Sequence, residues 1–531
     1  MPTGEGISRG VSTLNTGFTE RHFITYALGI FSPFVAIVCT GVLPQLWTIA
    51  YKADLSQTMT VLLLIGIWDL LNDYIIGYVQ DKQMLDKFMD REKWGRRASW
   101  LVTHLPGLQI CVLLLFIVPS SMTHPEEGDN AIYIYLAVVT FIMRWCTTQV
   151  YTAYKGGIIE IYASSADRLR LEFWLICFAW LAALFVILAL GAVIADGNDD
   201  ENCIAPEDTS AGNETSATAD SSTGEEGNAG RVIGIVFFFM MFSGYVCVPI
   251  LKTARRKADP NKVGSSMFSF LGHLFTDKAC IVYYSCVLLS EFHSTVNGAL
   301  YVFYIQYVSE EDREGTAGYS TLVGLFGMVS QILFGLFLKM RFAKGDRPRL
   351  WAVSMRLVYS VFMPVATIIP GNFSAGMFVI CYVVERFAYA PQTYWATMAK
   401  GLLADEDSLK EEGQRREGMF VGMHHLVSSF IAILVTLFIM SLDTIFGLDT
   451  QKCWGDPQPE SAVNFLKYTF TILLPFLGLI LSCLIYFFPI HGERLEILER
   501  KLVEAKAREG HATPRDTAKV VDAPDTTSVE A

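Results

Sequence analysis

The chain has 531 residues, of which 52% are hydrophobic and only 18% are charged, and its mean hydropathy is +0.37. Soluble domains carry about 25% charged residues, so this composition argues against a soluble protein and favours a membrane protein. The formal net charge is −12, but the acids crowd into segment 196–230 and the C-terminal tail; with no basic groove evident, we expect no nucleic-acid partner.

Stretches long enough to cross a bilayer as a helix occur twelve times along the chain. They lie at about 23–50, 58–80, 99–118, 131–154, 171–195, 231–251, 280–306, 317–339, 350–370, 373–397, 419–442 and 463–489. Residues 1–20 are polar, and the first apolar stretch is too long for the core of a cleavable signal peptide. The sequence therefore predicts an all-α membrane protein with twelve transmembrane helices.

A hydrophilic stretch in the middle of the chain separates the first six spans from the last six. The predicted segments are an N-terminus at 1–22, a first half at 23–251 with an external loop at 196–230, a linker at 252–279, a second half at 280–489 and a tail at 490–531. Lys and Arg concentrate in alternate loops, including the linker. By the positive-inside rule, this distribution places both termini in the cytoplasm.

The second span carries two acids, Asp69 and Asp73, in an otherwise apolar segment. A charge at the middle of a bilayer costs about 2.5–3.5 kcal/mol on insertion scales, so unpaired acids are rare there. Their spacing puts both carboxylates on one helix face, where both stay ionised only with a cation nearby. Paired carboxylates suit a hard cation, so we predict that they bind sodium, with a proton as the alternative ion. Pairing with Arg144 in a purely structural network is the other interpretation.

The loop that follows this span begins with Asp81 and continues with Trp94-Gly-Arg-Arg97. An acid at a helix end that pairs with arginines is able to latch two halves of a protein in one state. We predict this latch for Asp81, Arg96 and Arg97. The alternative is that the arginines only set the topology.

The external loops contain three residues of interest. Asn213-Glu-Thr215 is a glycosylation acceptor pattern; the pattern is common by chance, but here it lies in the longest external loop. Of eleven cysteines, nine fall within predicted spans, where we expect them to pack as small apolar side chains. Cys203 and Cys453 fall in external loops, where oxidation is possible.

Three motifs in chain order resemble the glycoside–pentoside–hexuronide:cation symporters, a branch of the major facilitator superfamily. They are Asp69-Leu-Leu-Asn-Asp73 with Trp94-Gly-Arg-Arg97, Asn297-Gly-Ala-Leu-Tyr301-Val-Phe-Tyr304, and Asp405 with Gly413-Gln-Arg-Arg-Glu-Gly418. The resemblance implies the major facilitator fold, with two six-helix halves, and it assigns Asp69 and Asp73 to the cation site. It also implies substrate contacts from the residues Arg144, Asn297, Tyr301, Tyr304 and His425. For any single aromatic side chain, packing is the alternative role.

The loop cysteines, the acceptor asparagine and Pro489-Ile-His-Gly-Glu-Arg494 further resemble the eukaryotic sodium-dependent lysophosphatidylcholine symporters. That resemblance implies a disulfide between Cys203 and Cys453 and a glycan on Asn213. The chain departs from this branch where Arg144 replaces an acid, His425 replaces a lysine and Leu175 replaces an arginine. Because a fold does not fix function, these departures affect the expected ion and substrate rather than the expected fold.

Together these features predict a cation-coupled symporter that moves a carbohydrate-like solute by alternating access, with sodium or a proton as the coupling ion and no other cofactor. A lysophospholipid symporter and a non-transporting membrane receptor are the alternatives. An intramembrane enzyme is disfavoured, because no nucleophile elbow appears. We expect a monomer in the lipid bilayer, most simply the plasma membrane.

Overall fold

The computed structural model describes residues 18–45, 47, 55–82, 91–119, 130–162, 165–196, 228–252, 267–309, 313–342, 348–410, 416–447 and 458–508. Every regular element within these ranges is a helix, which confirms the predicted all-α class. Cys203, Asn213 and Cys453 lie outside the described residues, so the disulfide and the glycan stay predictions.

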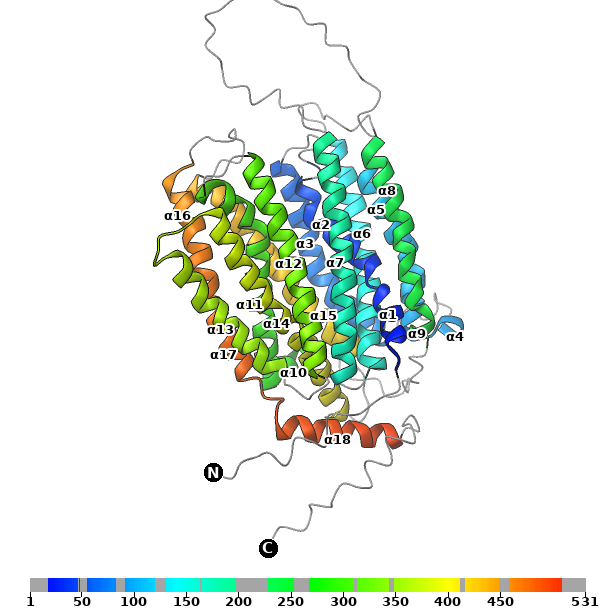
Figure 1. Ribbon diagram of the computed structural model, residues 1–531. Helices are drawn as coiled ribbons and strands as arrows, with labels where there is room; N and C mark the ends of the chain where they lie inside the picture. The colour runs from blue at the N-terminus through cyan, green and yellow to red at the C-terminus, as the bar shows by residue number, and fades with distance from the viewer. Residues whose placement is uncertain are drawn as a thin grey trace, which may run out of the picture.

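The helices form two sets, which Figure 1 shows side by side. The first set comprises α1 (Glu20–Leu28), α2 (Phe31–Gln45), α3 (Leu55–Lys82), α4 (Arg91–Trp94), α5 (Arg96–Phe116), α6 (Ala131–Ile161), α7 (Ser165–Asp196), α8 (Asn228–Met240), the 3₁₀-helix η3 (Met241–Cys247) and α9 (Val248–Leu251). The second set comprises α10 (Met267–Thr276), α11 (Lys278–Phe303), the π-helix η4 (Tyr304–Val308), α12 (Arg313–Phe342), α13 (Pro348–Thr367), α14 (Ala375–Lys410), α15 (Glu417–Phe446), α16 (Glu460–Tyr468), the π-helix η5 (Thr469–Leu473) and α17 (Leu474–Tyr486). The last helix is α18 (Glu493–Arg508).

A helix lies at each of the twelve predicted spans, and ten helices in the described ranges are long and apolar enough to cross a membrane. The other two predicted spans coincide with α12 and α14. The apolar stretch found in α12, Leu322–Phe337, is shorter, and α14 carries Glu385, Arg386 and Lys400 among its apolar residues. The fold class is therefore as predicted, although apolarity alone identifies ten of the twelve spans.

Three hydrophobic clusters hold the bundle together. One uses only residues between Phe23 and Leu251, and another uses only residues between Val296 and Leu474. A third cluster joins the two sets, for example through Phe173 of α7 and Trp395 of α14. Each set therefore has a core of its own, and apolar packing also connects the two sets.

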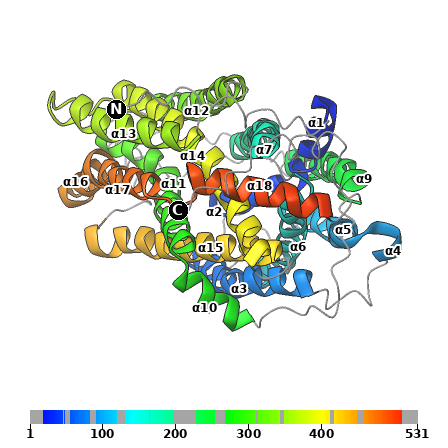
Figure 2. The same ribbon diagram turned by 90° about the horizontal axis from the view of Figure 1, so that it is seen from below.

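Helix α18 crosses one end of the bundle, here called the α18 end, and α16 lies at the opposite end, here called the α16 end (Figures 1 and 2). Arg494 of α18 forms an ion pair of 2.6 Å with Glu406 of α14. On the same helix Leu495, Leu498 and Leu502 pack against the third cluster. These contacts fix α18 to the end of α14.

The start of α11 is fixed by Asp277, whose carboxylate accepts hydrogen bonds from the backbone N–H groups of Ala279 and Cys280. Lys410, at the end of α14, donates to the same side chain at 3.0 Å. Burial acts to raise the pKa of Asp277, but the hydrogen bond from Lys410 and those of the N–H groups outweigh it and lower the pKa. Asp277 therefore stays charged at neutral pH and caps α11.

Helices α3 and α15 approach so closely that only glycine fits where they cross. A Cβ atom on Gly77 would overlap the carbonyl oxygen of Gly418, and one on Gly422 would lie 2.7 Å from the carbonyl oxygen of Asp73. Small residues let two helix backbones approach in this way. The crossing therefore holds Asp73, on the first helix set, directly against the second set.

Candidate functional site

A cavity of about 860 Å³ lies between the two helix sets. Residues from α2, α3, α6 and α7 line one side, and residues from α11, α12, α14 and α15 line the other. The lining extends from Lys155 and Lys400, toward the α18 end, to Thr40 and Thr436, toward the α16 end. This volume is in the range of about 300–1,000 Å³ that is usual for small-molecule sites.

Asp69 and Asp73 are buried side chains on the part of α3 that lines the cavity. The Thr148 hydroxyl donates to Oδ1 of Asp73 at 2.6 Å, and the Ser429 hydroxyl donates to Oδ2 at 3.1 Å. The Arg144 side chain places Nε 3.2 Å from Oδ2 of Asp69. Asp73 is therefore in contact with α6 of the first set and α15 of the second.

Two of the five residues predicted to contact substrate, Arg144 and His425, line the cavity. His425 meets the ring of Tyr151 edge-on, with the ring centroids 4.8 Å apart. Both side chains come from helices that also contact Asp73. The structure thus brings the predicted acids, Arg144 and His425 into one site.

The other three predicted contacts, on α11 and η4, are not among the described residues that line the cavity. Asn297 is buried, and Tyr301 lies beside Tyr382 with their ring centroids 5.9 Å apart. Tyr304 is fully buried and stacks on Phe378 at 4.3 Å. On α11 the cavity is lined by residues from Tyr283 to Thr295, so these three positions come after the lining stretch.

The cavity lining contains four more charged side chains that were not predicted as site residues. They are Lys155 of α6, Glu172 of α7, Glu291 of α11 and Lys400 of α14. The Lys155 ammonium lies 3.9 Å from Oε2 of Glu172. Lys155 and Lys400 come just after the predicted ends of their spans, 154 and 397, so the sequence does not single them out as intramembrane charges. Helices α6 and α14 in fact continue to Ile161 and Lys410.

A buried polar network lies behind the α14 wall of the cavity. Oxygens of Glu385 lie 3.3 Å from Arg356 and 3.1 Å from Arg386. Arg356 donates to Gln392 at 2.7 Å, and Gln392 in turn donates to Ser290. The network fixes the side chains of Arg386, Gln392 and Ser290, which line the cavity.

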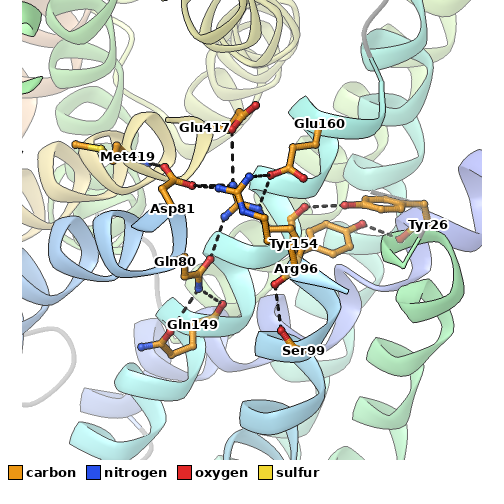
Figure 3. A network of polar contacts seen from close by, with 11 residues as sticks. Tyr26, Gln80, Asp81, Arg96, Ser99, Gln149, Tyr154, Glu160, Glu417 and Met419 are labelled. Carbon is orange, nitrogen blue, oxygen red and sulfur yellow. Dashed lines mark hydrogen bonds and ion pairs between the residues drawn. The ribbon is translucent and has the colours of Figure 1, made fainter. Parts of the chain in front are cut away.

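The three predicted latch residues lie together at the α18 end (Figure 3). Asp81 Oδ1 is 3.0 Å from Arg96 and 2.9 Å from Arg97. The same two arginines pair with Glu160 of α6, at 3.2 and 2.8 Å. Glu417 of α15 lies 3.9 Å from Arg97. The cluster therefore joins α3, α5 and α6 to the start of α15.

Two further contacts connect the helix sets at this end. The backbone N–H of Met419 donates to Oδ2 of Asp81 at 2.8 Å. Arg168 of α7 forms an ion pair of 2.8 Å with Asp405 of α14. With the glycine crossing of α3 and α15, these contacts hold the two sets together between the cavity and the α18 end.

Comparison with known proteins gives both a family and a fold. A family model described as "MFS/sugar transport protein" matches residues 34–492. No curated protein matches the sequence closely enough to count as a relative.

Two solved structures illustrate the fold. A bacterial homologue of the iron transporter ferroportin, in an outward-facing state, gives a TM-score of 0.56 at 14% identity, over 91% of this chain and 100% of that one. A variant of the E. coli fucose:proton symporter gives 0.50 at 12% identity, over 87% and 98%. At such identities the likeness shows a shared fold.

Proposed function

Because the chain belongs to the MFS/sugar transport family, it is a membrane transporter rather than an enzyme, and we propose that it is a cation-coupled symporter of a carbohydrate-like solute. The observation that carries the proposal is the pair of acids, Asp69 and Asp73, facing a cavity between two helix sets. The description of the family supports a sugar-like solute. Gln392, Ser290 and Tyr389 supply amide, hydroxyl and aromatic groups to the same cavity.

The coupling ion in this proposal is sodium. Carboxylates of Asp69 and Asp73 and hydroxyls of Thr148 and Ser429 provide the oxygen ligands that hard cations take. Oδ1 of Asp69 has no hydrogen-bond partner among the described residues, so it is available as a ligand. Because Ser429 belongs to the second helix set, an ion held by this group of oxygens would favour one arrangement of the two sets over the other.

Arg144 takes part in this mechanism as a stand-in for the ion. Its guanidinium supplies the positive charge beside Asp69 at 3.2 Å, and 32% of the side chain is exposed. An arriving sodium ion displaces the guanidinium, which then turns toward the solute. Ion binding thereby prepares the solute site, as coupling requires.

Alternating access fits the contacts at the two ends. Ion pairs and the glycine crossing hold the sets together at the α18 end, while the cavity lining continues toward the α16 end. The positive-inside rule predicts that the α18 end is cytoplasmic. On that basis we assign this conformation to the outward-facing state.

A lysophospholipid is the second candidate solute, and one observation favours it. Part of the cavity wall is apolar, with Ile30 just before α2, Phe34 of α2, and Leu62 and Leu63 of α3 on it. An acyl chain would lie against such a wall, whereas a sugar would not need it.

Sodium binding tests the proposal without knowledge of the solute. Sodium chloride should raise the melting temperature of the purified protein more than choline chloride does, since a ligand at 100 times its dissociation constant adds about 2.7 kcal/mol. Asp69→Asn or Asp73→Asn should remove this difference and also abolish sodium-driven sugar uptake into proteoliposomes. Glu493→Gln, an acid on exposed α18, is the matched control. If sodium stabilises both Asn variants as it does the wild type, the ion binds elsewhere. If the melting temperature depends on pH but not on sodium, the coupling ion is a proton.

A further inference from the structure

Two opposite charges in the cavity have no partner of their own. Glu291 of α11 and Lys400 of α14 both line the cavity, and within the described ranges neither makes a hydrogen bond or an ion pair shorter than 4 Å. They are close enough to influence each other electrostatically. A charged group at such a depth in a membrane protein is costly unless it is paired, and it usually marks a functional site.

The neighbouring charges are already engaged. Lys155 pairs with Glu172, and its ammonium lies 5.7 Å from the ring centroid of Tyr151. At the other charged positions of the lining, Arg144 lies against Asp69 in this conformation, before an ion displaces it, and Arg386 is bound by Glu385. The unengaged pair is therefore specific to Glu291 and Lys400, and the other ion pairs do not account for it.

From this pair we infer that the solute is a zwitterion, with its ammonium group on Glu291 and its anionic group on Lys400. The inference rests on the proposed symport function and adds the charge of the solute. A neutral sugar would leave both side chains without a direct ion-pair contact, and a singly charged sugar would leave one of them without such a contact. When all four are ionised, Glu291, Lys400, Lys155 and Glu172 carry two negative and two positive charges, so only a net-neutral ligand leaves the group neutral in a poorly hydrated cavity.

Aromatic side chains around the pair suit the same ligand. Tyr283 of α11, together with Tyr389 and Trp395 of α14, lines the same cavity as the two charged residues. Aromatic faces attract ammonium groups as well as the apolar faces of sugar rings. A polyhydroxylated solute with one amino group and one acidic group uses every feature of this part of the cavity.

Four derivatives of one sugar separate the contributions: glucose, glucosamine, gluconate and glucosaminate, which carry no charge, a positive charge, a negative charge and both. The last two are open-chain acids, so gluconate is the reference of the same shape for glucosaminate. Their affinities are measured by the shift in melting temperature of the purified protein in saturating sodium. Glucosaminate should bind at least about tenfold more tightly than gluconate or glucosamine, since an unpaired member of a buried charge pair is heavily penalised. Glucose should bind most weakly.

Two variants assign the charges. Glu291→Gln should make glucosaminate bind no better than gluconate, and Lys400→Gln should make it bind no better than glucosamine. Lys410→Gln removes a positive charge from the same helix outside the cavity and should keep the wild-type order. The double variant Glu291→Lys with Lys400→Glu retains both charges and should restore the preference for glucosaminate.

A lipid headgroup offers the same chemistry, so lysophosphatidylcholine and lysophosphatidic acid form a second arm. If the protein prefers the zwitterionic lysophosphatidylcholine, and if Glu291→Gln removes that preference, the inference is supported and the solute is a lipid. The inference is overturned if neither arm shows a preference for the doubly charged ligand, or if both Gln variants keep that preference. Sodium stabilisation is measured in the same samples. If it persists while no preference for the zwitterion is found, the zwitterion inference is wrong but the symport proposal is not contradicted.

Discussion

Arg144 is the residue whose position connects the ion site to the rest of the cavity. Its Nε contacts Asp69, yet a third of its side chain is exposed, so it is neither fully buried in a structural ion pair nor free. A partly exposed ion pair contributes about 0.2–1 kcal/mol, which is small enough for a cation to break.

Replacing Arg144 by Gln should therefore strengthen sodium binding. Without a competing guanidinium, the sodium affinity should rise by up to about fivefold, which corresponds to 1 kcal/mol. Sodium titrations of the melting temperature, at alkaline pH to suppress competition from protons, measure the change. Solute uptake should fall in the same variant, because the freed guanidinium is missing from the cavity. Weaker sodium binding would instead identify Arg144 as a structural support of Asp69.

The sequence identified only part of this site. The residues that it identified lie well inside apolar spans, whereas Lys155 and Lys400, which it missed, lie at the ends of such spans. Asp69, Asp73 and Arg144 fall well inside apolar spans, where a charge stands out at once. Lys155 and Lys400 come just after the apolar part of their helices, where hydropathy does not separate a cavity charge from a loop charge. Only the real lengths of α6 and α14 show that these ammonium groups reach the cavity.

Among the described helices, α3 and α15 have a restrictive contact, because their backbones meet at Gly77, Gly418 and Gly422. The crossing lies between the ion site at Asp73 and the latch at Asp81, both on α3. A change in spacing there alters both sites together. The crossing is thus a candidate pivot for the relative movement of the two sets.

An alanine at Gly77 tests this role. The added methyl group would overlap the carbonyl oxygen of Gly418, and such overpacking costs about 1–3 kcal/mol. We expect a lower melting temperature and a loss of most uptake. Gly324→Ala in α12 is the control, because nothing lies within 4 Å of the new methyl group; it should leave the melting temperature unchanged or raise it. Equal melting temperatures and equal uptake in the two variants would show that α3 and α15 can move apart at the crossing without loss of stability or function.

Hydropathy located the helices but not their interruptions. The first predicted span, 23–50, is broken between α1 and α2, where a Cβ atom on Gly29 would lie 2.5 Å from the sulfur of Cys247. The last span is divided by η5. Such breaks depend on contacts with distant parts of the chain, and a pattern along the sequence does not record them.

At the scale of the whole molecule, the two helix sets are held together at the α18 end by a few polar contacts, and these have to break if the transporter is to alternate. Arg168 to Asp405 is the most easily tested of them. Arg168 also donates to the carbonyl oxygens of Tyr162 and Ile159, so replacing it would disturb the turn between α6 and α7. Asp405 makes its ion pair from the other set and is the better position to change.

Asp405→Asn should shift the protein toward the state that is open at the α18 end. The variant keeps the shape of the side chain but removes the charge that faces Arg168 at 2.8 Å. Both groups are largely buried, and breaking a buried pair costs about 3–5 kcal/mol. Because a two-state equilibrium moves from 1:99 to 99:1 with about 5.5 kcal/mol, this loss is enough to populate the other state. A cysteine in place of Lys400 is reached from the α18 end only in that state. A membrane-impermeant maleimide added only on the α18 side of sealed vesicles should therefore label it faster in the Asp405→Asn background. Glu406→Gln, which removes the adjacent acid and its contact with α18, is the control. Equal labelling rates in the Asp405→Asn and Glu406→Gln backgrounds would show that the ion pair between Arg168 and Asp405 does not hold the α18 end closed.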